Sequence, residues 1–555
     1  MMSQRGGLRR EALWVAALSI APLLPFLDKA LSVDAPVFVA VARRILEAPA
    51  DPFGFEMYWD ATSLHVAAFN RNPPLLSYWL APWIALFGER DWVLNLAALP
   101  FPLLAGLSFL GIARRWTAEG LAPALLLVTA PAFVVLATSL LLDVPLLAFT
   151  LAAVCALLRG AESGRAGWLW LAGVLAAAAG LTKYVGLSTG PLLLAGAVLL
   201  FPRRPGAWLR VLAPPALVWG AWAAFTARQY GSVHFLGSTD VVFGRSFDAR
   251  LVWNQLAAVP IWYGLSLVFP VALWGRALVR GSRGVELAVA ALVLGAAAAV
   301  WLLPSGLPPR RHPIELEEQL LAVAGFAGGV FVWASLLRPR ELRRGPEQAF
   351  LLVWLAGLLV FSAAVNWHVN AGDALVAAPP ALLLLYRSDA LRPSRRFAFG
   401  CAAGALALSL GLAAAERAQV NFYREVAPEI AAEIGARPGT RWFVGSWGFQ
   451  HEMERQGFRP VLPPELAAPA LAVGDWIATP RNVAQPDISL HRRLYPVREE
   501  RTWEKRTWNP LRTTNPDATA GFYSHRYGYV PFAWSREPLE RIQLLRVEAA
   551  TDTPR

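Results

Sequence analysis

Long apolar runs recur along most of this chain, and they constrain its fold more than any other feature. About twenty consecutive apolar residues are needed to cross the hydrocarbon part of a bilayer as a helix. We therefore expect an α-helical integral membrane protein with about thirteen transmembrane helices. The predicted spans lie near residues 11–30, 92–113, 119–138, 144–159, 167–182, 186–201, 207–226, 255–275, 285–303, 318–337, 348–366, 372–386 and 396–415.

Charged residues are scarce and unevenly placed. They make up 16% of the 555 residues, against roughly 25% in an average soluble domain. The net charge of +12 comes largely from arginines in alternate short turns, such as those at 114–115 and 203–204. Turns of this kind face the cytoplasm, so topology explains the charge and no nucleic-acid partner is expected. The basic MMSQRGGLRR segment places the N-terminus in the cytoplasm, and an odd number of spans then places the C-terminus outside.

Two regions outside the spans are long enough to hold chemistry. We divide the chain into a transmembrane domain, 1–415, and an extracytoplasmic C-terminal domain, 416–555. Within the first, the external loop 31–90 contains APVFVAVARRILE, whose apolar face at helical spacing predicts a helix in the membrane interface. The aromatic PPLLSYWLAPWIALFG predicts a second. In the C-terminal part, helix-like NFYREVAPEIAAEIG alternates with strand-like RWFVG and DWIATP, which predicts a soluble α/β domain.

Two aspartates stand out as candidates for catalysis. Acidic residues are costly in or near lipid and are usually retained for function. Asp34 follows the first span directly, and Asp143 lies in the tight turn TSLLLDVPLL. The simpler alternative is that each marks a solvated helix end. Their position on the same membrane face as the long loop and the C-terminal domain favours a functional role.

A lysine adds a third point on that face. Lysine occurs only at positions 29, 183 and 505, and Lys183 lies between two spans in GLTKYVG. An ammonium suits an anionic phosphate, although the alternative is a lysine that reaches toward lipid phosphates in general. Arg310 and Arg311 in LPPRRHPIE also break the charge pattern. They either serve the same anion or mark a misplaced span.

Familiar metal and nucleotide motifs are missing from the sequence. The histidines predicted to be external lack metal-ligand spacing, and the two cysteines lie inside apolar runs, so no metal site is predicted. No Walker loop, GxGxxG or GxSxG sequence occurs in a suitable context. An enzyme on the external face would therefore take an activated group from a lipid carrier.

Four segments in order resemble the membrane glycosyltransferases of the GT-C class. They are SVDAPVFVAVARRIL, NPPLLSYWLAPWIALFGERDW, LLLDVPLL and GLTKYVGL. The resemblance is greatest to family 39, which includes protein O-mannosyltransferases, and to the related lipid A aminoarabinose transferases. It implies an inverting glycosyltransferase in the bacterial inner (plasma) membrane. Such an enzyme moves a sugar from a polyprenyl-phosphate donor to an extracytoplasmic acceptor, which could be lipid A, a protein or another glycan.

The resemblance also implies roles for individual residues. Asp34 matches a general base on the acceptor hydroxyl, and Asp143 matches an acid that positions substrate or catalytic groups. Lys183 matches a position associated with the carrier phosphate. These roles agree with the chemistry, because a carboxylate can remove a hydroxyl proton and a cation can stabilise a departing phosphate. Further candidates for substrate binding are Arg310, Arg311, His65 and Asn72.

Two departures from the family pattern leave questions open. Ala35 stands where many relatives carry a second acid, and Asp373 lies near a place where relatives often carry an arginine. No cofactor is assigned, and a divalent metal stays open. The alternative functions are a transporter or flippase, or a non-catalytic binder of lipid-linked saccharides. A transporter would be expected to have polar or broken spans that meet at the midplane, whereas the acids here gather at one face.

Overall fold

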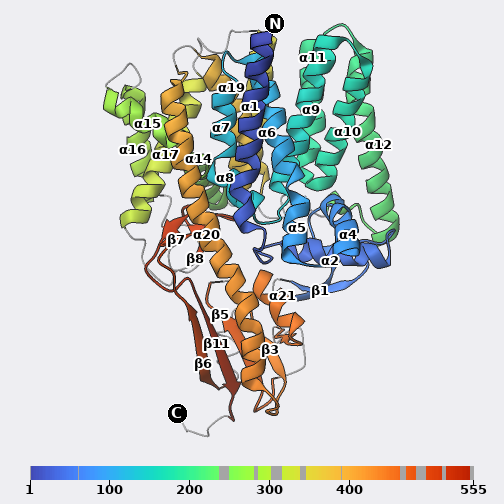
Figure 1. The fold of residues 1–555 in the computed structure, drawn as a ribbon, viewed down its shortest axis with the longest axis vertical. Helices are drawn as coiled ribbons and strands as arrows, with labels where there is room; N and C mark the ends of the chain where they lie inside the picture. The colour runs from blue at the N-terminus through green and yellow to red at the C-terminus, as the bar shows by residue number, and fades with distance from the viewer. Residues whose placement is uncertain are drawn as a thin grey trace.

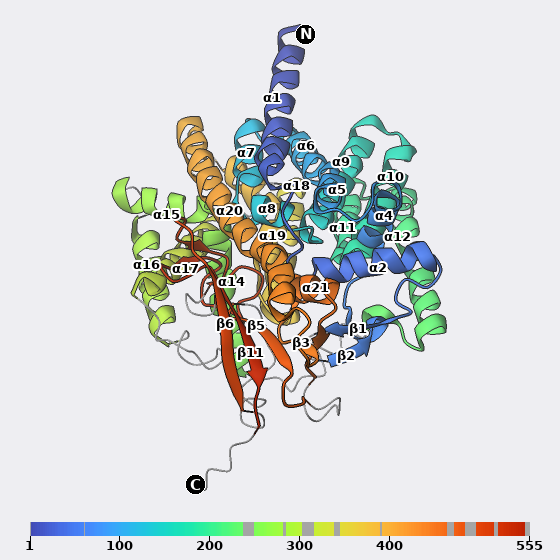
Figure 2. The same cartoon turned by 60° about the horizontal axis from the view of Figure 1, so that its bottom comes forward.

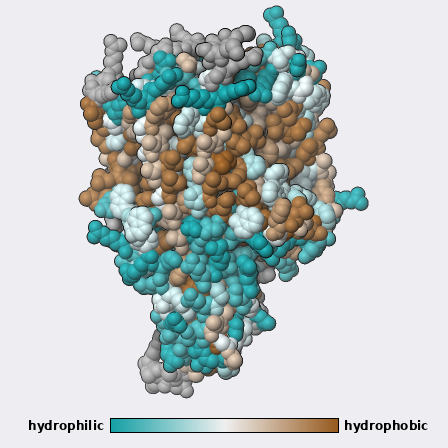
Figure 3. Space-filling model, in the orientation of Figure 1, coloured by the Kyte–Doolittle hydropathy of each residue, from teal (hydrophilic) through white to brown (hydrophobic). Residues whose placement is uncertain are grey.

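The computed structural model describes residues 2–59, 62–236, 249–280, 285–301, 316–337, 345–388, 391–462, 471–482, 496–515 and 520–549. The N-terminal part is a bundle of helices, and the strand-containing C-terminal part projects from one end of it (Figure 1). On the face shown in Figure 3, a hydrophobic belt crosses the bundle, whereas the projecting part is mainly hydrophilic. The predicted class, a helical membrane protein with a C-terminal region that contains strands, is confirmed.

Every predicted span coincides with helical structure. The bundle helices are α1 (Met2–Ile20), α5 (Asp91–Ala98), α6 (Pro100–Trp116), α7 (Leu121–Val128), α8 (Pro131–Ala137), α9 (Asp143–Ser163), α10 (Ala166–Thr182), α11 (Thr189–Leu200), α12 (Pro205–Tyr230), α14 (Ala249–Leu267), α15 (Phe269–Arg280), α16 (Val285–Trp301), α17 (Leu316–Leu336), α18 (Pro346–Val360), α19 (Ala371–Arg387) and α20 (Arg395–Ile434). Short helical turns, η2 (Tyr184–Ser188) and η3 (Phe361–Val365), extend α11 and α18.

The helices that are long enough to cross a membrane singly are fewer than the predicted spans. Among the described residues, five continuous helices have the required length and apolar composition, or six if one bent pair is a single span. That pair is α14 and α15, which we predicted as one span over 255–275 and which bend by 89°. Val268 at the bend takes a φ of +66°, a conformation that a β-branched residue rarely adopts, and Pro270 lies two residues further on. The count of about thirteen spans stays a prediction.

The first external loop folds against the end of the bundle. It contains η1 (Ala21–Phe26), α2 (Ala35–Glu47), β1 (Glu56–Trp59), β2 (Thr62–His65), α3 (Val66–Phe69) and α4 (Leu75–Phe87). The two helices expected in this loop are thus present as α2 and α4, and Figure 2 shows α2 beside the C-terminal part. The apolar face of α2 packs inside the protein, because Val37, Val41 and Ile45 are at most 5% exposed. The face that suggested an interfacial helix therefore contacts α4 and neighbouring helices.

One helix joins the bundle to the C-terminal part. α20 has 40 residues and continues without a break through the predicted domain boundary at residue 415. Its second half packs beside a five-stranded sheet and α21 (Trp447–Arg455). The predicted domains, 1–415 and 416–555, are thus connected by a continuous helix, and the boundary itself stays a prediction.

The C-terminal sheet is mixed. Its strand order is β4 (Arg459–Pro460), β3 (Arg441–Phe443), β5 (Trp476–Pro480), β11 (Glu540–Val547) and β6 (Val497–Lys505). β3 runs parallel to β4 and β5, whereas β11 is antiparallel to β5 and β6. The strand-like segments RWFVG and DWIATP form β3 and β5, as predicted. Two smaller antiparallel pairs lie nearer the bundle: β7 (Leu511–Arg512) with β10 (Ala533–Trp534), and β8 (Thr514–Asn515) with β9 (Ala520–Gly521).

A buried ion pair connects these parts. Lys29 Nζ donates to Glu416 Oε1 at 2.7 Å and to Ser139 Oγ at 2.8 Å. The hydroxyl of Tyr523 donates to the same carboxylate oxygen at 2.5 Å, and that of Thr513 donates to Oε2 at 3.0 Å. The Lys29 and Glu416 side chains are 0% and 3% exposed. One carboxylate on α20 therefore holds the first loop, the turn after α8 and the C-terminal segment together.

We expect Lys29→Met to lower the free energy of unfolding by about 3–5 kcal/mol, because it leaves the Glu416 carboxylate buried without its cation. The double variant Lys29→Met/Glu416→Gln should recover part of this loss. Unfolding in detergent micelles would measure both. Arg417→Met is a matched control, since it breaks an exposed pair with Asp28 that contributes about 1 kcal/mol or less. Equal losses in Lys29→Met and Arg417→Met would refute the importance of the buried pair.

Candidate active site

Asp34 lies where the first external loop enters α2. It occupies the N-cap position of that helix, and its side chain is partly buried. The preceding residue, Val33, has a φ of +48°, which costs energy for a β-branched side chain. Strained backbone of this kind is common at functional sites, and here it sets the direction of the residue that follows.

Asp143 and Lys183 form an ion pair beside that loop. Asp143 begins α9, and Lys183 follows the last residue of α10. Lys183 Nζ donates to Asp143 Oδ1 at 2.8 Å, with side-chain exposures of 25% and 11%. The turn before Asp143 again contains a strained residue, because Leu140 has a φ of +51°. Two residues predicted from separate loops are thus in direct contact.

The N-terminus of α19 forms the wall behind Asp143. A β-carbon added to Gly372 would lie 2.0 Å from Asp143 Oδ1, so the carboxylate packs directly against the glycine backbone. Asn370 and Asp373 cap this helix reciprocally: each side chain accepts a hydrogen bond from the backbone N–H of the other. The partial positive charge of a helix N-terminus attracts a neighbouring acidic side chain, and the carboxyl group of Asp143 lies against this one.

The charges of Asp143 and Lys183 also act on Asp34. Burial raises the pKa of Asp34 to about 6; the charge of Lys183 opposes this rise, and that of Asp143 adds to it. Burial lowers the pKa of Lys183, but the carboxylates of Asp143, Asp373 and Asp34 outweigh it and raise the value overall. The site therefore contains a lysine that stays protonated and an aspartate that titrates near neutral pH. A carboxylate with such a pKa is suited to act as a general base.

The C-terminal part closes one side of this site. His525 N donates to Val369 O at 2.8 Å, and Val369 N donates to His525 Nδ1 at 2.9 Å. Ala371 N also donates to Phe522 O at 3.0 Å, just before Gly372. Burial lowers the pKa of His525 to about 4, so its ring is neutral and carries its proton on Nε2. The segment 522–525 therefore holds the loop that leads into α19.

The other predicted residues lie apart from this group. The His65 ring is 6.1 Å from that of Tyr230, and Asn72 N donates to Asn70 Oδ1. Among the described residues, no hydrogen bond or ring contact links either side chain to Asp34, Asp143 or Lys183. Arg310 and Arg311 lie outside the described residues. In the described part of the chain, no group of three or more His, Cys, Asp or Glu side chains is arranged to hold a metal ion.

Three features near the site escaped the sequence analysis. Gly372 is one of many glycines, and its contact with Asp143 joins segments more than 200 residues apart. Glu416 resembles any acid at the end of a span. The C-terminal segment 522–525 has no recognisable catalytic motif. Asp373 was noted only as a departure from the family, although its position beside a predicted helix start was a usable signal.

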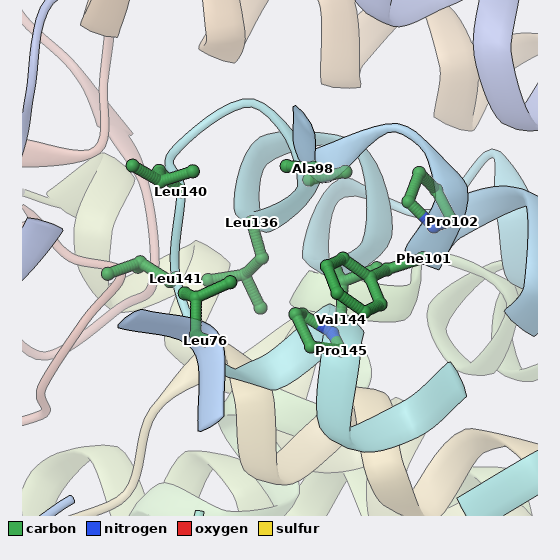
Figure 4. Close-up of a pocket in the computed structure, with 10 residues that line it drawn as sticks. Leu76, Ala98, Phe101, Pro102, Leu136, Leu140, Leu141, Val144 and Pro145 are labelled. Carbon is green, nitrogen blue, oxygen red and sulfur yellow. The ribbon is translucent and has the colours of Figure 1, made fainter. Parts of the chain in front are cut away.

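An apolar cavity lies next to Asp143 (Figure 4). It has room for about one water molecule, and it lies between α4, α6, the turn after α8 and the start of α9. Its wall is formed entirely by apolar side chains: Leu76, Ala98, Phe101, Pro102, Leu136, Ala137, Leu140, Leu141, Val144 and Pro145. The surface at the start of α9, next in sequence to Asp143, is thus apolar.

Comparison with known proteins supports the resemblance found in the sequence. Residues 71–227 match the family described as dolichyl-phosphate-mannose-protein mannosyltransferase, and this confirms the predicted similarity to membrane glycosyltransferases. The matched region contains Asp143 and Lys183 but begins after Asp34. No curated protein sequence matches the chain significantly.

Several solved structures are similar in overall arrangement. ArnT from Cupriavidus metallidurans in the apo state is 16% identical, with a TM-score of 0.45 over 89% of this chain and 95% of that one. ArnT bound to undecaprenyl phosphate is 17% identical, with a TM-score of 0.46 over 87% and 94%. The arabinofuranosyltransferase AftD from Mycobacteria is 14% identical, with a TM-score of 0.40 over 97% of this chain and 40% of that one.

The contact between Gly372 and Asp143 can be tested directly. We expect Gly372→Ala to lower the sugar-transfer activity expected from the sequence by about 100-fold, because a displacement of about 1 Å at a reacting group can cost that much. Helix content should be unchanged, since alanine favours helices. Gly404→Ala in α20 is the control, because an added β-carbon meets nothing within 4 Å there. Equal transfer rates for the two variants would show that the position of Asp143 does not depend on the absence of a side chain at position 372.

Proposed function

We propose that this chain, which carries a domain of the dolichyl-phosphate-mannose-protein mannosyltransferase family, is a membrane glycosyltransferase. It moves a sugar from a polyprenyl-phosphate donor to an acceptor hydroxyl. The observation that carries the proposal is the grouping of Asp34, whose pKa is about 6, with the ion pair Asp143–Lys183. A base for the acceptor and a cation for the phosphate are the two groups that this transfer needs.

The reaction follows from those two groups. The Asp34 carboxylate takes the proton of the acceptor hydroxyl as its oxygen attacks the anomeric carbon of the donor sugar. The bond between that carbon and the phosphate oxygen breaks, and its electron pair stays on the phosphate. The Lys183 ammonium stabilises the negative charge that develops there. Attack opposite the leaving phosphate inverts the anomeric centre and leaves polyprenyl phosphate and the glycosylated acceptor.

Asp143 acts in this scheme as a positioning residue. An ammonium has three N–H donors, and the bond to Asp143 uses one of them, so Lys183 can also bind a phosphate oxygen. The Asp143 carboxylate is itself held between Lys183 and the backbone of Gly372. Lys183 is therefore fixed before the donor arrives, which lowers the cost of ordering the site during the reaction.

The surroundings agree with a lipid-linked donor. The apolar side chains around the small cavity at the start of α9 suit contact with a lipid-linked donor. We assign the site to the extracytoplasmic face of a bacterial inner membrane, and we propose His65, Asn72, Arg310 and Arg311 as further substrate-binding residues. The acceptor is lipid A, a protein or another glycan.

The decisive experiment replaces the proposed base. We expect Asp34→Asn to lower transfer by about 10²- to 10⁴-fold, the range typical of general acid–base catalysis. In the unmodified protein, kcat/KM should rise with pH and level off above a pKa of about 6, because only ionised Asp34 can accept the proton. Asp34→Asn should lose this rise. Transfer from a purified polyprenyl-phosphate sugar in nanodiscs would measure both.

The control for this variant is Asp28→Asn, which alters an exposed carboxylate of the same loop. Donor binding is measured separately, because a transporter or a non-catalytic binder would bind the lipid donor without transferring its sugar. If Asp34→Asn transferred sugar at the normal rate with an unchanged pH profile, the proposed base would be wrong.

Lys183 can be tested through the donor. We expect Lys183→Ala to raise the apparent KM for the polyprenyl-phosphate sugar by about 10-fold or more, since a charge-assisted phosphate contact is lost, with a smaller effect on the acceptor KM. Lys183→Arg should restore only part of the affinity, because a guanidinium differs in shape. Lys505→Ala, in the C-terminal part, is the matched control. An unchanged donor KM in Lys183→Ala would remove this role.

A further inference from the structure

The turn between β6 and β7 carries a tryptophan, Trp508, whose side chain is almost fully exposed. Trp508 is 94% exposed, the highest value among the large hydrophobic side chains in the described part of the chain. Its backbone is nevertheless fixed, because Asn509 N donates to Thr507 Oγ1 at 3.2 Å and Leu511 N donates to Asn509 Oδ1 at 3.1 Å. A hydrogen-bonded turn thus holds a large apolar side chain away from the protein. Exposed apolar side chains of this kind often contact a membrane or another protein.

The turn lies beside the apolar part of α20. Asn509 Nδ2 donates to Gly411 O at 2.7 Å, and Leu511 packs against the same glycine. Gly411 precedes Arg417, the first partly exposed charge, by six residues, or about 9 Å along the helix. The rise per residue of an α-helix gives about 32 Å between Arg396 and Arg417 along α20. This length is close to the hydrocarbon thickness of a bilayer, roughly 30 Å. Trp508 therefore lies on the apolar side of the boundary that the exposed charges mark.

A second exposed indole lies on the neighbouring strand. Trp534 of β10 pairs with Leu511 of β7 and is 41% exposed. Its indole N–H donates to Glu317, which lies in the first turn of α17, a candidate span. The β7–β10 pair is thus tied to two membrane helices, α20 and α17, at the end of the bundle (Figure 1).

We propose that Trp508 and Trp534 anchor the β7–β10 pair in the headgroup layer of the membrane that the bundle spans. Indole rings favour that layer, because their apolar area enters the acyl boundary while their N–H stays near water. Lys505 and Arg506, which precede the turn, pair with Glu425 and Glu504, so the two indoles are the groups that contact lipid. Lipid then supports the C-terminal segment that, through 522–525, holds the start of α19.

Site-directed fluorescent labels would test this contact in the full-length protein. After Cys155→Ala and Cys401→Ala, a label is attached at Trp508→Cys or, to keep the indole, at Arg506→Cys. The control is Val473→Cys, which is 67% exposed near the far end of the sheet. In nanodiscs that contain nitroxide-labelled phospholipids, we expect quenching at 506 and 508 to exceed that at 473 by about five-fold or more.

Two results would overturn the proposal. Equal quenching at 473 and at both turn positions would place the turn in water. Shielding of both turn positions from lipid-borne and aqueous quenchers alike would show that protein covers the turn, whether another copy of the chain or a different partner.

Discussion

The Lys29–Glu416 ion pair is the interaction on which the arrangement of the site depends. Lys29 lies five residues before Asp34, and Ser139, which also binds the ammonium, lies four residues before Asp143. Tyr523 binds the same carboxylate and lies two residues before His525. Three segments that meet at the site are thus anchored at one buried point. A buried carboxylate needs all of these partners, because an incompletely paired charge in this setting is strongly destabilising.

Close packing at the α19 N-terminus provides the second constraint. Asp143 can approach Lys183 in the observed way because position 372 has no side chain. The capping box between Asn370 and Asp373 fixes the first turn of α19, and the C-terminal segment fixes the loop before it. The catalytic arrangement is therefore built by the bundle and the C-terminal part together. A division at residue 415 would separate groups that act as one unit.

The sequence predicted the helices and the site to different extents. Every long apolar run is helical, because lipid admits few other backbone structures. Asp143 and Lys183 were predicted to lie on a common membrane face, but their ion pair was not predicted. The bend between α14 and α15 was missed, because the run is apolar on both sides of Val268 and hydropathy does not report backbone angles. Glu416, Gly372 and segment 522–525 were missed for a different reason: their roles arise from contacts between distant segments, which local pattern does not encode.

The charge balance of the site suggests how donor binding prepares the base. Asp34, Asp143 and Asp373 surround one described lysine, and burial already raises the pKa of Asp34 to about 6. A bound donor adds a negative phosphate near Lys183, which weakens the influence of that cation on Asp34. Since a nearby negative charge raises a carboxylate's pKa, Asp34 becomes a stronger base once the donor is in place. In the proposed reaction, Lys183 thus couples the two steps: it binds the donor phosphate, and its charge influences the proton affinity of Asp34, the proposed base.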